Sequence, residues 1–165
     1  MTTRDDAATP LEIRGARPAD AALLTELAHA AKRHWRYADE LIRLWREDLT
    51  VTPEFIDAHA VECAVFGSRI VGFYALSGDG PTRELEHMWV DPAYMGRGVG
   101  RRLLRHAVAA LRAAGCACLE IASDPNAEGF YLKYGAVRVG QVPARPEGRT
   151  LPLLELRIAP EAAVS

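Results

Sequence analysis

Residues 84–104 hold a strand pattern, a glycine-rich loop and a helix pattern in uninterrupted succession, and no other stretch constrains the fold as much. The strand ends at Val90, and the loop at residues 95–100 leads directly into an amphipathic helix. Gly98 and Gly100 lack side chains, so the backbone can approach a ligand closely there. The first turn of a helix has unpaired N–H groups at the positive end of its dipole. This stretch therefore predicts a site for an anion, and phosphate is the usual one.

The spacing of the glycines narrows the kind of phosphate ligand. Arg97, Arg101 and Arg102 lie beside the loop and add positive charge. A dinucleotide-binding loop would have its third glycine where this chain has Arg101. A nucleoside-triphosphate loop would continue as Gly-Lys-Ser or Gly-Lys-Thr, and no lysine lies nearby. The spacing therefore disfavours both of these nucleotide-binding classes.

The composition is that of an ordinary soluble domain. The chain has 165 residues, of which 49% are hydrophobic and 25% charged, with a net charge of −2. We expect one domain at residues 11–160 after a flexible tail at 1–10. The small net charge predicts no nucleic-acid partner, and no apolar run reaches the ~18 residues of a membrane span.

The cysteines indicate the compartment and argue against a metal. There are three, an odd number, which argues against a secreted disulfide framework and for a reducing, cytoplasmic compartment. Cys116 and Cys118, which we expect on one strand, are too few for a zinc site. We therefore expect all three cysteines to be small packing residues and the protein to need no metal.

Periodicity and turn residues predict an ordered series of helices and strands. Asp20 and Thr52 are expected to cap helices. Three consecutive strands with tight turns predict an antiparallel meander, and the helix after the third predicts a crossover to a parallel strand. The expected strands are 11–15, 63–66, 69–76, 82–90, 117–123, 137–142 and 151–158, and the expected helices are 20–35, 39–49, a short one from 53, 99–115 and 124–135.

Two motifs in this order resemble those of the GNAT superfamily of N-acetyltransferases. Val90-Asp91-Pro92 followed by Gly98-Val99-Gly100 resembles the family's pyrophosphate-binding loop. Residues 124–136 resemble its second motif, because several spacings agree. The positions that match the second motif are Ala127, Phe130, Tyr131 and Gly135. The resemblance covers about residues 69–142, and the first sixty residues match in element order alone.

The resemblance implies a fold and a cofactor. The fold would be α/β (α+β), with a GNAT-like mixed, mostly antiparallel sheet of about seven strands and helices on both faces. A central splay between strands 82–90 and 117–123 would hold the pantetheine of acetyl-CoA. Its amides would pair with backbone groups that otherwise cost ~1–3 kcal/mol each when buried and unpaired. We expect acetyl-CoA contacts from Met88, Trp89, Val90, Met95, Gly96, Arg97, Gly98, Val99, Gly100, Arg101, Asp124, Asn126, Phe130 and Tyr131.

The resemblance also suggests catalytic residues. Tyr131 falls where the family places the general acid for the coenzyme A sulfur, although it could instead be an aromatic on the inner face of a short helix. Glu84 and Glu86 lie on the strand before the loop, two apart and so on one face, and either could be the base; Glu84 matches a catalytic glutamate of some members. His87 would project to the opposite face unless a bulge reverses it, and we interpret it as structural.

The acceptor side would be built from the first two helices. Trp35 and Tyr37 are candidate substrate contacts together with Glu84, whereas Trp45 fits a core stripe. The resemblance implies acetyl transfer from acetyl-CoA to a primary amine by direct attack in a ternary complex. The acceptor would be a small-molecule amine or a protein amino group, and exposed closing strands are compatible with a homodimer.

Two departures from the family motifs support an alternative. Met95 replaces a usual Arg or Gln, and Asp124 replaces an asparagine, so both weaken the expected set of polar cofactor contacts. Ala136 also replaces a phenylalanine. The alternative is a catalytically silent acyl-CoA-binding domain that acts as a sensor or interaction module.

Overall fold

The computed structural model describes residues 10–161, so nearly all of the predicted tail at 1–10 lies outside the described residues. The helices and strands follow the predicted order closely. They are β1 (Leu11–Gly15), the 3-10 helix η1 (Pro18–Asp20), α1 (Ala21–His34), α2 (Asp39–Leu44), α3 (Pro53–Ala58), β2 (Ala60–Phe66), β3 (Arg69–Ser77), β4 (Thr82–Val90), the 3-10 helix η2 (Pro92–Tyr94), α4 (Val99–Ala113), β5 (Cys118–Ala122), α5 (Glu128–Lys133), β6 (Val137–Ala144) and β7 (Arg149–Arg157).

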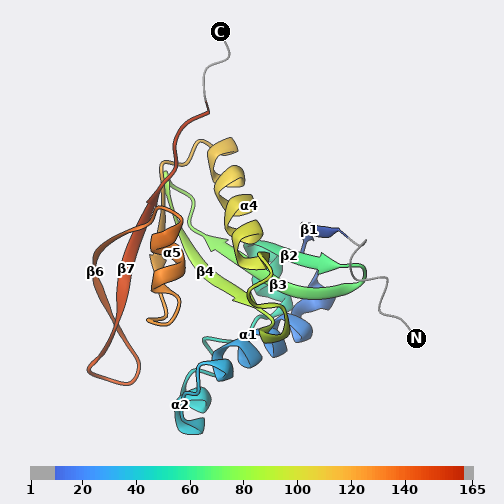
Figure 1. The fold of residues 1–165 in the computed structure, drawn as a ribbon, viewed down its shortest axis with the longest axis vertical. Coiled ribbons are helices and arrows are strands. Elements are labelled where there is room, and N and C mark those ends of the chain that lie inside the picture. The colour runs from blue at the N-terminus through green and yellow to red at the C-terminus, as the bar shows by residue number, and fades with distance from the viewer. Residues whose placement is uncertain (1–9, 162–165) are drawn as a thin grey trace.

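The strands form one seven-stranded sheet in the order β1-β2-β3-β4-β5-β7-β6. All neighbours are antiparallel except β4 and β5, which are parallel because α4 crosses over between them. Figure 1 shows β6 and β7 splayed away from β1–β3, with α5 lying beside β4 and β7. The predicted mixed, mostly antiparallel sheet is confirmed.

The splay lies between β4 and β5. Their pairing covers three positions, from Thr82 opposite Cys118 to Glu84 opposite Glu120. Beyond Glu84, β4 continues to Val90 without a pairing partner in β5. The edge of β4 that faces β5 is therefore open along residues 85–90, as the resemblance to the GNAT superfamily implied.

The helices cover both faces of the sheet. Residues on β3 alternate between two cores: Tyr74 packs with Leu103 of α4, whereas Phe73 and Ala75 pack with the α1 side. The period of two in a strand sends neighbouring side chains to opposite faces, which explains this division. α4 lies on one face of the sheet, and α1, α2 and α3 belong to the other core (Figure 1).

Several boundaries differ from the prediction; β2, for example, begins at Ala60 rather than Cys63. The helix at Asp39 ends at Leu44 rather than Leu49, because the chain turns to bury the ring of Trp45, which is 4% exposed. The last helix begins at Glu128 rather than Asp124, because the Asp124 carboxylate accepts a hydrogen bond from the Asn126 amide and forms a turn before it. Cys116 precedes β5 and does not share a strand with Cys118.

The two predicted helix caps behave differently. The Thr52 hydroxyl accepts from the Phe55 amide at 3.0 Å, so this cap is confirmed. Asp20 occupies the N-cap position of α1, but its carboxylate makes no capping bond to that helix. It accepts instead from the Arg17 amide and the Arg14 guanidinium, both before the helix. Asp20 therefore ties β1 to the start of α1.

Candidate active site

A cavity of about 990 Å³ runs along the splay and is lined by residues from several helices and strands and from the loops between them. Its walls come from α1, β4, the glycine loop, α4, β5, α5 and the β6–β7 hairpin. A cavity of this size is large enough for an extended ligand and a second small molecule beside it. The glycine loop lines one part of the cavity. The last residues of α1, the segment at 45–49 and the β6–β7 hairpin line another part, which we call the acceptor end.

The glycine loop presents unpaired backbone amides to this cavity. Gly98 has φ +82°, a left-handed conformation that non-glycine residues rarely adopt, and it is the N-cap of α4. The first helix amide with a backbone acceptor is that of Arg102, which donates to the Gly98 carbonyl at 3.1 Å. The N–H groups of Val99, Gly100 and Arg101 have no acceptor among residues 10–161. They form a site suited to phosphate at the start of the helix.

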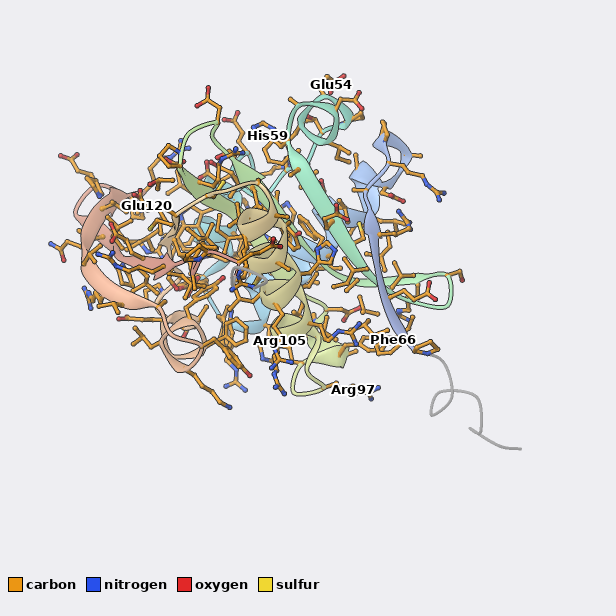
Figure 2. The ribbon with its side chains drawn as sticks, turned by 90° about the horizontal axis from the view of Figure 1, so that it is seen from above. Glu54, His59, Phe66, Arg97, Arg105 and Glu120 are labelled. Carbon is orange, nitrogen blue, oxygen red and sulfur yellow. The ribbon has the colours of Figure 1, made fainter. Side chains whose placement is uncertain are left out.

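The arginines around the loop do not all face the cavity. Arg101 lines it, whereas Arg97 stacks on the Tyr94 ring at 5.1 Å and is exposed. Figure 2 shows Arg97 at the outer edge of the molecule, on the same side as Arg105 of α4. Arg102 donates to the Leu11 carbonyl and so ties α4 to β1. Of these side chains, Arg101 is placed to meet a ligand in the cavity.

Helices α4 and α5 approach each other closely at the loop. A Cβ atom on Gly100 would lie 3.3 Å from Cζ of Phe130, tighter than most such contacts. Phe130 also lines the cavity, together with Met95, Gly96 and Asn126. The absence of a side chain at Gly100 therefore allows the ring of α5 to pack on the start of α4, directly beside the unpaired amides.

The open edge of β4 forms the middle of the cavity. Met88, Trp89 and Val90 line it, in the part of β4 that β5 does not pair. An extended ligand with amide groups could add to this edge as a strand does. The geometry suits the pantetheine contacts that we predicted for Met88 and Val90.

Tyr131 lies on the cavity wall with its ring 6% exposed. Its hydroxyl makes no hydrogen bond within residues 10–161. In this range every fully buried side-chain oxygen or nitrogen has a hydrogen-bond partner, so the Tyr131 hydroxyl is not fully buried. The hydroxyl therefore keeps some accessible surface, and Tyr131 is among the residues that line the cavity. Burial, and secondarily the negative charge of Asp124, raises the pKa of Tyr131, so the phenol holds its proton at neutral pH.

The two candidate bases differ in position. Glu86 accepts a hydrogen bond from the Ser77 hydroxyl at 2.6 Å. Both glutamates are exposed, but Glu86 lines the cavity and Glu84 does not. A bulge explains this, since β3 pairs Ala75 with His87 and Leu76 with Leu85, leaving Glu86 as the extra residue. Slight burial and the neighbouring charges of Glu86 and Glu120 raise the pKa of Glu84. The geometry favours Glu86 over Glu84.

The bulge also turns His87 toward the cavity, which it lines while being 8% exposed. The Trp89 indole donates to Nδ1 of His87 at 3.0 Å, so this nitrogen carries no proton. Burial lowers the pKa of His87 to about 4. His87 is therefore a neutral imidazole that positions Trp89 on the cavity wall.

A buried polar cluster closes the far end of the cavity. Nζ of Lys32 lies 2.5 Å from the Asp124 carboxylate, and each side chain is 8% exposed. The Tyr37 hydroxyl and the Asn126 amide also donate to Asp124. Burial would raise the pKa of Asp124, but the bonds from Lys32 and Asn126 outweigh it and lower that pKa. Burial lowers the pKa of Lys32, against the opposing effect of Asp124.

Asp124 thus has a structural partner that the sequence did not reveal. We predicted it as a cofactor contact, and it lines the cavity, but its carboxylate is occupied by Lys32, Tyr37 and Asn126. Tyr37, predicted as a substrate contact, is not part of the lining and acts here through its hydroxyl. Trp35 does line the cavity, at the end of α1.

Sequence reasoning also missed Arg149, Arg145 and Asp48, which all line this end. Arg145 pairs with Asp48 at 3.0 Å, and the Trp45 indole donates to the Arg145 carbonyl at 2.8 Å. Trp45 is therefore both a core residue and part of the wall. The one usable sequence signal was Lys32, a cation on the buried stripe of α1 between Ala28 and Trp35.

Other ligand classes find little support in residues 10–161. No group of three or more His, Cys, Asp or Glu side chains is arranged to hold a metal ion in this range. In the same range, no helix is long and apolar enough to cross a membrane.

Comparison with known proteins assigns the family. The model of the acetyltransferase (GNAT) family matches residues 22–136. The chain belongs to this family. The match begins at α1, well before the region at 69–142 where the motifs alone showed the resemblance, so α1 to β3 are GNAT elements as well.

Two curated GNAT relatives share part of their length with this chain. N-alpha-acetyltransferase RimI of Mycobacterium tuberculosis is 40% identical over 79 residues, which are 45% of this chain and 49% of RimI. Glucosamine 6-phosphate N-acetyltransferase 1 of Oryza sativa is 33% identical over 114 residues, 69% of this chain and 65% of that protein. The chain thus spans about half to two thirds of these relatives' length.

The fold agrees with solved GNAT structures. PaiA N-acetyltransferase from Thermoplasma acidophilum, in complex with coenzyme A, superposes with a TM-score of 0.75 at 21% identity, covering 90% of this chain and 99% of that one. At this identity the likeness concerns the fold alone.

Proposed function

We propose that this protein transfers an acetyl group from acetyl-CoA to a primary amine by direct attack within a ternary complex. The observation that carries the proposal is the continuous cavity joining the unpaired amides at Val99–Arg101, the open edge of β4 and the Tyr131 hydroxyl. Family membership supports it, since the relatives matched are named as N-acetyltransferases.

The residues present fit coenzyme A. The three unpaired amides and Arg101 would hold its pyrophosphate, and the edge of β4 at Met88 and Val90 would pair with its pantetheine amides. Bound acetyl-CoA would supply the acyl group as a thioester. Met95, which replaces a polar residue of the family motif, lines the same end without adding a charged contact.

Two side chains would handle protons. Tyr131 keeps its proton at neutral pH and would donate it to the departing thiolate, because this residue lines the cavity. Glu86 would accept the proton of the acceptor ammonium, directly or through water, since it lines the cavity beside the end of β4. A backbone N–H at the end of β4 would stabilise the developing oxyanion, worth about 3 kcal/mol in a dry site.

The acceptor is a small-molecule amine or a protein amino group. We further expect a reducing, cytoplasmic compartment, supported by the free thiols of Cys63, Cys116 and Cys118. A homodimer is compatible with β6, an edge strand on which Val137 and Val139 are exposed.

A thiol-release assay with acetyl-CoA and a panel of amines tests this function, with the acetylated product identified by mass spectrometry. We expect amine-dependent release of free coenzyme A in step with product formation. Thermal stabilisation by coenzyme A but not by ATP or NAD should accompany it. Stabilisation without release for any amine would instead support a silent acyl-CoA-binding domain.

A further inference from the structure

Arg149 is a cation at the acceptor end of the cavity that has no carboxylate partner among residues 10–161. It lies at the start of β7, half-buried, with its guanidinium 4.4 Å from the ring centroid of Trp45 and 5.6 Å from that of Tyr37. One N–H group donates to the Tyr37 hydroxyl at 3.3 Å. A guanidinium has five N–H donors, so most of them remain for a ligand.

The aromatic rings hold this guanidinium in place. Trp45 is 4% exposed, and its indole is fixed by the Arg145 carbonyl. Tyr37 is fixed by Asp124 and Asn126. A planar guanidinium held against two fixed rings keeps one orientation, as bidentate recognition of a carboxylate or phosphate requires.

The charge balance at this end of the cavity favours an anion. Lys32 is paired with Asp124, and Arg145 is paired with Asp48. Within the described range, Arg149 is then the one charged side chain at this end that lines the cavity without an ion partner. Glu86 on β4 is the one carboxylate of the lining without an ion partner in the same range. Nζ of Lys32 and Cζ of Arg149 each lie 4.4 Å from the ring centroid of Trp45, so both cations lie against the same ring.

We propose that the acceptor amine carries an oxyanion, a carboxylate or a phosphate, which Arg149 binds while Glu86 faces the amine. This rests on the proposed acetyl transfer and specifies its substrate class. The opposite charges of the two unpaired groups match a zwitterionic acceptor and orient it in the cavity. A simple cationic polyamine would leave Arg149 unpaired and be repelled by it.

Matched amine pairs test the proposal. The carboxylate arm compares ω-amino acids, from glycine to 6-aminohexanoate, with the corresponding amides, which keep the shape and lose the charge. The phosphate arm compares O-phosphoethanolamine with ethanolamine and glucosamine 6-phosphate with glucosamine. Each amine is measured in two ways. The thiol-release assay gives kcat/KM, and calorimetry gives the affinity for the complex of the protein with coenzyme A.

The variants are Arg149→Gln, Arg149→Lys and the control Arg157→Gln. The control removes an exposed arginine from the same strand, outside the cavity. We expect the native protein to prefer the anionic member of at least one pair by about 10- to 100-fold. The ratio of the value for the anionic amine to that for its neutral counterpart should fall to about one in Arg149→Gln. It should recover partly in Arg149→Lys and persist in Arg157→Gln.

The binding measurement decides the proposal independently of turnover. If no amine is acetylated but an anionic amine binds through Arg149, the proposed transferase function is rejected and the proposed anion site is supported. Equal binding of charged and neutral members in both arms, or a preference that survives in Arg149→Gln, overturns the anion site even if acetyl transfer is observed. The arm that shows the larger ratio identifies carboxylate or phosphate.

Discussion

Lys32 of α1 and Asp124 of the loop after β5 form an ion pair with 2.5 Å between Nζ and the carboxylate, almost fully shielded from water. The pair joins the helix that forms the acceptor end of the cavity to the segment that leads into α5. Tyr131 lies on α5, so this contact connects the acceptor side with the proposed general acid. Neither residue belongs to a pattern that would have paired them in the sequence.

Breaking this pair should be costly. Lys32→Met leaves the Asp124 carboxylate buried without its cation, and we expect a loss of about 3–5 kcal/mol in the free energy of unfolding, measured with a chemical denaturant. As a control, Arg145→Gln breaks the exposed pair with Asp48 and should cost less than about 1 kcal/mol. Equal effects of the two substitutions would show that the buried pair does not stabilise the fold in the way we describe.

Gly98→Ala should affect both stability and cofactor binding. A Cβ at φ +82° costs about 1–2 kcal/mol, and relief of this strain would shift the amides that begin α4. We expect calorimetry to show a Kd for coenzyme A raised by about ten-fold or more. Gly80→Ala is the matched control, because its Cβ would meet no atom within 4 Å and its φ is not positive. Unchanged affinity in Gly98→Ala would argue against the loop as the phosphate site.

Substitutions of the two glutamates of β4 should affect activity to different extents. Glu86→Gln removes a carboxylate from the cavity wall, and we expect kcat/KM to fall by about 10²-fold, measured at several pH values. Glu84→Gln, a change of the same chemistry two residues away but outside the cavity, should have a much smaller effect. A larger loss in Glu84→Gln than in Glu86→Gln would reverse our assignment of the base.

The buried His87 should make stability depend on pH. Its pKa is lowered to about 4 in the folded protein from the ordinary 6.5, so the unfolded chain takes up a proton that the folded site refuses. This contribution is present above pH 6.5 and is lost as the pH falls toward 4, by roughly 3 kcal/mol. In His87→Asn, which keeps an acceptor for the Trp89 indole, the fall between pH 6.5 and 4 should be smaller by that amount. Identical pH curves for both proteins would mean that His87 is not held neutral.

Local patterns in the sequence predicted the scaffold well. The loop at Gly98–Gly100 and the crossover from β4 to β5 are encoded by consecutive residues, so turn chemistry and period sufficed to place them. The parallel pairing at Thr82 and Cys118 followed from the connecting helix. The ends of helices were predicted less accurately because they depend on contacts between residues far apart in the sequence. α2, for example, ends just before Trp45, whose indole donates to the Arg145 carbonyl.

The acceptor end could not be predicted for the same reason. Lys32, Asp124 and Arg149 come from α1, a loop and β7, and more than a hundred positions separate Lys32 from Arg149. They lie together because the tertiary fold brings these three segments to one part of the cavity. The bulge at Glu86 is a second example: a strict period of two would treat Glu84 and Glu86 alike, whereas one extra residue moves Glu86 to the cavity wall.

The most direct test of the account is the turnover number of Tyr131→Phe, with acetyl-CoA and the acceptor both saturating, together with its Kd for coenzyme A. Removal of the hydroxyl leaves the ring packed in α5, so we expect kcat to fall by about 10²-fold or more while the Kd stays the same. An unchanged kcat would contradict the role of Tyr131 as the proton donor and with it the proposed mechanism.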